Sequence, residues 1–129
     1  MNYLLDTHTV LWFAENSPKL SVVAKETILR QDGMNFVSIV SAWELAIKIS
    51  LGKIRIDGGV EEFFNIVDRN GFLFLPIKRE HIQQAETLPF EHRDPFDRIL
   101  ICAAIREVLT VITHIRQLRF FKSYFPESQ

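Results

Sequence analysis

The stretch YLLDTHTVLWFA, residues 3–14, places a short apolar run directly before an acidic residue and a second apolar pattern. Residues 3–5 have the composition of a buried β-strand, and residues 9–14 have helical spacing. Asp6 stands between them, where a buried strand would end. Because burying an unpaired carboxylate costs several kcal/mol, this placement indicates either a helix N-cap or a ligand site.

Strand and helix patterns alternate along the rest of the chain. Further strands are predicted at 36–39, 72–77 and 108–112, and helices at 22–29, 41–51, 60–70, 80–88, 95–107 and 116–124, with a loop at 89–93. This alternation is typical of parallel strands joined by right-handed helical crossovers. We therefore predict a three-layer α/β/α fold with a central parallel sheet of four to five strands. Ligands bind such sheets at the carboxyl ends of the strands.

Length and composition fit one domain, residues 1–129, with 47% hydrophobic residues to fill a single core. The net charge of −1 excludes strong overall basicity, so any polyanionic partner must meet a local basic patch. The single cysteine, Cys102, excludes an intramolecular disulfide framework and is expected in the core. We expect no secretion signal and no membrane span, and hence a cytoplasmic protein.

Two predicted helices carry a carboxylate on an otherwise apolar face. Glu44 lies three residues before Ile47, and Asp97 lies four residues before Ile101, so each acid shares a face with apolar residues. Lys48, four residues after Glu44, offers an alternative explanation, because a surface ion pair at this spacing is common and contributes only a few tenths of a kcal/mol.

Helix capping is the corresponding alternative for the acids near Pro95. Asp94 directly precedes this proline, which favours an N-cap, and Asp97 stands where the acidic partner of a capping box would stand. Capping does not exclude metal binding, so both explanations stay open for Asp6, Asp94 and Asp97.

Convergence of Asp6, Glu44, Asp94 and Asp97 would create repulsion that a hard divalent cation relieves, and Mg²⁺ and Mn²⁺ prefer such oxygen ligands. Zinc is a poor match. We expect surface or second-shell positions for the four histidines, which show no paired ligand spacing: His8, His81, His92 and His114.

Water bound to an acid-held Mg²⁺ suits the hydrolysis of phosphodiesters, because the ion lowers the pKa of the attacking water and stabilises the leaving oxygen. The substrate phosphates would then need cationic or hydroxyl contacts. We predict Lys48, Arg98 and Thr113 as substrate-binding residues.

Three segments together resemble the PIN domain of the VapC type, the ribonuclease toxin of bacterial toxin–antitoxin pairs. They are LLDTHTVLWF at 4–13, SAWELAIKISLGKI at 41–54 and HRDPFDRILICAA at 92–104, in the order and separation of the family. The resemblance implies that the catalytic, metal-binding acids are Asp6, Glu44 and Asp97. It also places Asp94 in a DPFD subgroup pattern, as a further metal ligand or a residue that shapes the loop.

The same resemblance implies a Mg²⁺ or Mn²⁺ cofactor and cleavage of single-stranded regions of RNA. It further implies a homodimer, and inhibition by a cognate VapB-like antitoxin whose C-terminal segment lies across the catalytic groove.

One segment departs from the family pattern. Family members commonly carry threonine or serine, any residue and then aspartate after the last strand, whereas this chain has Thr113, His114 and Ile115. The missing acid puts a second metal in doubt unless Asp94 compensates. A catalytically weak or inactive module that binds RNA or antitoxin is therefore the alternative function. A haloacid-dehalogenase-like phosphatase fits less well, because His8 stands in place of that family's second acid.

Overall fold

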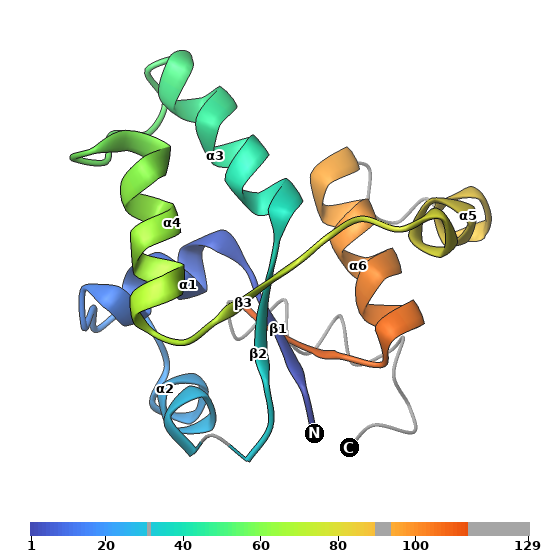
Figure 1. The fold of residues 1–129 in the computed structure, drawn as a ribbon, viewed down its shortest axis with the longest axis horizontal. Coiled ribbons are helices and arrows are strands. Elements are labelled where there is room, and N and C mark those ends of the chain that lie inside the picture. The colour runs from blue at the N-terminus through green and yellow to red at the C-terminus, as the bar shows by residue number, and fades with distance from the viewer. Residues whose placement is uncertain (31, 90–93, 114–129) are drawn as a thin grey trace.

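A computed structural model describes residues 1–30, 32–89 and 94–113 of the protein (Figure 1). Its strands are β1 (Tyr3–Leu5), β2 (Asn35–Ser38), β3 (Leu73–Leu75) and β4 (Thr110–Ile112). Its helices are α1 (Thr7–Ala14), α2 (Val22–Arg30), α3 (Ile39–Ser50), α4 (Gly59–Arg69), α5 (Arg79–Thr87) and α6 (Pro95–Glu107). The predicted helix at 116–124 and most of the predicted loop at 89–93 lie outside the described residues.

The four described strands form one parallel sheet in the order β3-β2-β1-β4. Tyr3 of β1 pairs with Asn35 of β2 on one side and with Thr110 of β4 on the other. The predicted parallel α/β sheet is therefore confirmed. The central position of β1 places Asp6, the next residue, at the middle of the carboxyl edge.

Helices cover both faces of this sheet, with α1 and α4 on one side and α5 and α6 on the other (Figure 1). The strand β1 shows how this happens, because neighbouring side chains of a strand point to opposite faces. Leu5 packs in a cluster with Val10 of α1 and Phe63 of α4, whereas Leu4 packs in a second cluster with Leu100 of α6. A strand buried on both faces is continuously apolar, which explains the sequence of residues 3–5.

Two helices begin earlier than their apolar patterns predict, because polar caps start them. Asp6 accepts a hydrogen bond from the backbone N–H of Thr9 at 2.8 Å, so α1 begins at Thr7. Ser38 accepts one from the N–H of Val40 at 3.1 Å and starts α3 at Ile39. The N-cap explanation for Asp6 is thus confirmed.

The last described strand is shorter than predicted. Val108 has a left-handed backbone conformation, with φ of 56°, and ends α6 as its C-cap. Strand β4 consequently begins only at Thr110.

None of the helices in the described part of the chain is long and apolar enough to cross a membrane.

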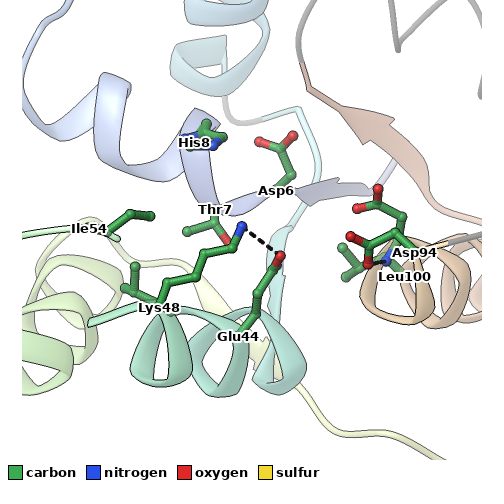
Figure 2. Close-up of a pocket in the computed structure, with 10 residues that line it drawn as sticks. Asp6, Thr7, His8, Glu44, Lys48, Ile54, Asp94 and Leu100 are labelled. Carbon is green, nitrogen blue, oxygen red and sulfur yellow. Dashed lines mark hydrogen bonds and ion pairs between the residues drawn. The ribbon is translucent and has the colours of Figure 1, made fainter. Parts of the chain in front are cut away.

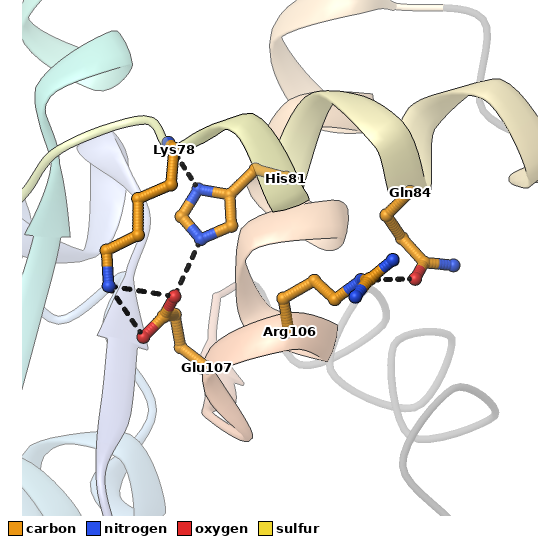
Figure 3. Close-up of polar contacts among 5 residues, drawn as sticks. All are labelled: Lys78, His81, Gln84, Arg106 and Glu107. Atoms are coloured by element: carbon orange, nitrogen blue, oxygen red, sulfur yellow. Dashed lines mark hydrogen bonds and ion pairs between the residues drawn. The ribbon is translucent and has the colours of Figure 1, made fainter.

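A polar cluster joins α5 to the C-terminal end of α6 (Figure 3). His81 is completely buried, so the prediction of a surface position is wrong for this histidine, and its ring contacts Lys78 and Glu107 rather than a predicted metal ligand. Its Nδ1 accepts a hydrogen bond from the N–H of Lys78 at 3.1 Å, and its Nε2 lies 2.8 Å from the carboxylate of Glu107. Because Nδ1 accepts, the tautomer with the proton on Nε2 satisfies both ring nitrogens.

The same carboxylate also pairs with the ammonium of Lys78 at 3.2 Å. The hydrogen bond from His81, more than any other contact, lowers the pKa of Glu107 below its ordinary value of 4.5. Because the pKa of this carboxyl group is lowered, the interaction stabilises the folded state fully at pH values above the unfolded-state pKa. This stabilisation is lost as the pH falls through the folded-state pKa.

We therefore expect Glu107→Gln to reduce the free energy of unfolding by about 1 kcal/mol at neutral pH, since it removes a charge-assisted hydrogen bond. The difference from wild type should shrink as the pH falls below 4.5, because Glu107 is protonated first in the unfolded chain and then, at its lower pKa, in the folded protein. Urea unfolding across this pH range measures both effects. Glu86→Gln, at an exposed position of α5, is the control, and an equal loss in both variants would contradict a specific role for the α5–α6 cluster.

Candidate active site

A pocket of about 190 Å³ opens at the carboxyl edge of the sheet, between α1, α3 and α6 (Figure 2). Its lining includes the four acids that the sequence analysis selected: Asp6, Glu44, Asp94 and Asp97. Segments that are far apart in the sequence thus bring their carboxylates to one place, as the alternation of strands and helices predicts.

Asp6 is held by two neighbouring elements. Its Oδ1 accepts the hydrogen bond from Thr9 that caps α1, and its Oδ2 accepts one from the hydroxyl of Thr113. Thr113 is buried and follows β4, which lies beside β1 in the sheet. This neighbour relation explains how a residue at the far end of the chain orients the first acid. A contact of Thr113 with substrate stays a prediction.

Glu44 projects from the second turn of α3 and pairs with Lys48, with 2.9 Å between a carboxylate oxygen and the ammonium. The ion pair that the sequence offered as an alternative is therefore present. It does not lie on an open surface, however, because both residues line the pocket and the Glu44 side chain is only 14% exposed. Figure 2 shows the lysine stem running along α3 so that its ammonium meets the glutamate within the pocket.

Asp94 and Asp97 come from the start of α6. Asp94 is the N-cap, since its Oδ1 accepts hydrogen bonds from the N–H groups of Phe96 at 2.8 Å and of Asp97 at 3.2 Å. Capping by Asp94 is thus confirmed, and it fixes the first turn on which Asp97 stands. Asp97 is half-buried and faces the same pocket.

The electrostatics of the pocket are most evident at Asp97. Its pKa is raised from 3.8 to about 6, first by burial and then by the negative charges of Asp94, Glu44 and Asp6, while the charge of Lys48 lowers it. A raised pKa means that the surroundings of this carboxyl group destabilise its charged form. A cation bound nearby would stabilise the charged form and lower the pKa. Perturbed acids of this kind are typical of functional sites.

Arg98, the neighbour of Asp97, closes the C-terminus of α5. Its guanidinium donates hydrogen bonds to the carbonyls of Pro89 at 2.9 Å and of Ala85 and Leu88 at 3.1 Å each. These carbonyls end a helix and would otherwise lack partners. The described contacts of Arg98 therefore stabilise the connection into α6, and its predicted contact with substrate stays a prediction.

Aromatic contacts that the sequence analysis did not identify support the walls of the pocket. The rings of Trp43 and Phe96 meet edge to face, with 5.3 Å between centroids, and so join α3 to α6. Each ring stands next in sequence to a pocket acid. On the opposite wall His8 lines the pocket and stacks on Trp12 at 5.6 Å. Of these two ring contacts, only the one between His8 and Trp12 has a signal in the sequence, because residues four apart on a helix are neighbours.

The donor set fits a hard divalent cation, because carboxylate oxygens are the ligands that Mg²⁺ and Mn²⁺ prefer. Among the residues that the structure describes, however, no three histidine, cysteine, aspartate or glutamate side chains are arranged to hold a metal ion. In the structure Asp6 accepts a hydrogen bond from the hydroxyl of Thr113, and Glu44 pairs with the ammonium of Lys48. The residues present therefore suit a cation chemically, and side-chain rotation would have to bring their oxygens together.

Comparison with curated protein sequences gives no match. Among solved structures, the chain is similar to one in the crystal structure of VapBC2 from Rickettsia felis bound to a DNA fragment from their promoter. The TM-score is 0.65 with 17% sequence identity, and the alignment covers 94% of this chain and 93% of that chain, which shows a shared fold. The sequence profile of the PIN domain matches residues 3–118. The chain therefore belongs to the PIN domain family.

Proposed function

We propose that this chain is a VapC-like toxin that hydrolyses phosphodiester bonds of single-stranded RNA with Mg²⁺ or Mn²⁺. The observation that carries the proposal is the shared pocket of four carboxylates, in which burial, and after it the charges of the other three acids, raise the pKa of Asp97. PIN domains are generally nucleases, which agrees with this chemistry.

In this proposal Asp6, Glu44 and Asp97 hold the cation, with Asp94 as a further ligand or only as the cap of α6. The bound ion would supply an activated water and would offset charge on the leaving oxygen. Each acid has a support of its own. Thr113 orients Asp6 through its hydroxyl, and the cap by Asp94 presents Asp97 on the first turn of α6.

The proposed partners are single-stranded RNA, a cognate VapB-like antitoxin and a second copy of the chain, acting in the cytoplasm. The solved structure with the similar fold is a VapBC2 complex bound to promoter DNA, and this supports an antitoxin of the VapB kind. Lys48 and Arg98 remain the proposed contacts to RNA phosphates.

A catalytically weak or inactive PIN module is the second candidate. Two observations favour it: Ile115 replaces the usual fourth acid, and the described acidic side chains are not arranged around a metal position. Such a module would bind RNA or antitoxin without cleaving RNA.

A cleavage assay separates the two candidates. Purified wild type should cut unstructured RNA in the presence of Mn²⁺ and stop in EDTA. Asp6→Asn and Asp97→Asn should each lose at least about 100-fold in rate, since even indirect support of a metal site is worth 10- to 100-fold. Asp68→Asn, an exposed acid of α4, is the matched control. Antitoxin binding without any metal-dependent cleavage would instead favour the inactive module.

The raised pKa of Asp97 predicts how stability depends on pH in the metal-free protein. Because the folded-state pKa is about 6 and the ordinary value is 3.8, the folded state binds this proton more tightly than the unfolded state. Stability should therefore fall as the pH rises from 3.8 to about 6, and Asp97→Asn should remove this fall.

Thermal unfolding of EDTA-treated protein across this pH range measures the effect. Millimolar Mn²⁺ should raise the melting temperature of wild type above pH 6, because it binds the charged carboxylates of the folded state, and should raise that of Asp97→Asn much less. Parallel pH profiles for the two proteins would contradict a repulsive acidic pocket.

A further inference from the structure

The acidic pocket contains its own cation. Among the described residues that line it, Lys48 is the one lysine or arginine, and it stands with four carboxylates. Its ammonium lies 2.9 Å from Glu44, one helical turn away on α3. Its charge also acts on Asp97: it lowers the pKa of this carboxyl group, whereas the charges of the three other acids raise it.

Among the residues that the structure describes, two further basic side chains lie close to the acids and are engaged differently. Arg98 follows Asp97 in sequence, yet its guanidinium donates to the carbonyls that end α5. His8 lines the pocket, is exposed and stacks on Trp12. Direct neutralisation of a pocket carboxylate is therefore shown for Lys48, whose side chain is 39% exposed and has a flexible four-carbon stem.

We propose that Lys48 takes the place of the divalent cation in the metal-free pocket, and that metal binding transfers its ammonium from Glu44 to an RNA phosphate. This inference rests on the proposed function, since it needs both a metal and an RNA substrate at this site.

The exchange follows from charge. A divalent cation that recruits the Glu44 carboxylate repels the ammonium already bound to it, so the ion pair and metal coordination weaken each other. Glu44 is largely buried and would be left without a counter-charge if neither cation were present. Lys48 thus keeps the metal-free pocket stable and at the same time weakens its affinity for metal.

A displaced ammonium needs a new anionic partner, and a phosphate oxygen of RNA at the pocket is suitable. RNA binding should therefore make the displacement easier, and metal binding should make the ammonium available to RNA. Linkage requires that this coupling be reciprocal, so each ligand should raise the affinity for the other. Removal of Lys48 should weaken the coupling.

The test is a calorimetric titration of EDTA-treated protein with Mn²⁺, with and without a single-stranded 2′-deoxy oligonucleotide, which supplies backbone phosphates without being the proposed RNA substrate. Lys48→Met should bind Mn²⁺ about tenfold more tightly than wild type in the absence of oligonucleotide, because the competing charge is gone. The oligonucleotide should raise the Mn²⁺ affinity of wild type by a larger factor than that of Lys48→Met, and equal factors would contradict the inference.

Two further variants complete the design. Lys53→Met removes the same charge from an exposed position whose backbone N–H bonds to the carbonyl of Lys48, and it should leave Mn²⁺ affinity within about twofold of wild type. Lys48→Gln keeps a hydrogen-bond donor for Glu44, so it provides a folded, uncharged variant if Lys48→Met is unstable.

Equal or weaker Mn²⁺ binding by both Lys48 variants would overturn the inference, as would an equal gain in Lys53→Met. If in that case wild type still binds Mn²⁺ and Asp97→Asn does not, the proposed nuclease function stands without it. If wild type binds no Mn²⁺ with or without oligonucleotide, the metal-dependent function and the inference both fail.

Discussion

Mutual repulsion among carboxylates that share one pocket is the constraint on which the site depends. The parallel sheet brings Asp6 to the centre of its carboxyl edge, and α3 and α6 bring Glu44 and Asp97 beside it. Hydrogen bonds and one ion pair hold most of these charges, while burial and repulsion raise the pKa of Asp97 to about 6. Such a pocket folds without a cation and would gain free energy from one that bound its carboxylates.

The helix α6 is the platform for half of this site, and it is held at both ends. Near its start, Arg98 ties it to the carbonyls that end α5, and the edge-to-face contact with Trp43 ties it to α3. At its other end, Glu107 binds the buried ring of His81. These contacts fix the position of Asp97 without touching it, so substitutions among them should act on the site through the orientation of α6.

The order of strands and helices and the identity of the pocket acids could be predicted from the sequence, because apolar runs and helical spacing are local signals. The partners of these residues could not. His81 meets Glu107 across 26 residues, and Asp6 meets Thr113 across 107, distances over which no periodicity extends. Even the local pair of Glu44 and Lys48 was foreseen only as a surface contact, since spacing does not show which helix face lines a pocket.

A crystal structure of the protein grown with Mn²⁺, located by its anomalous signal, tests the account most directly. We predict one strong peak in the pocket, with oxygens of Asp6, Glu44 and Asp97 as ligands and the ammonium of Lys48 turned away from Glu44. A pocket that holds no Mn²⁺ and keeps the contact between Lys48 and Glu44, with the metal absent or bound elsewhere, would contradict it.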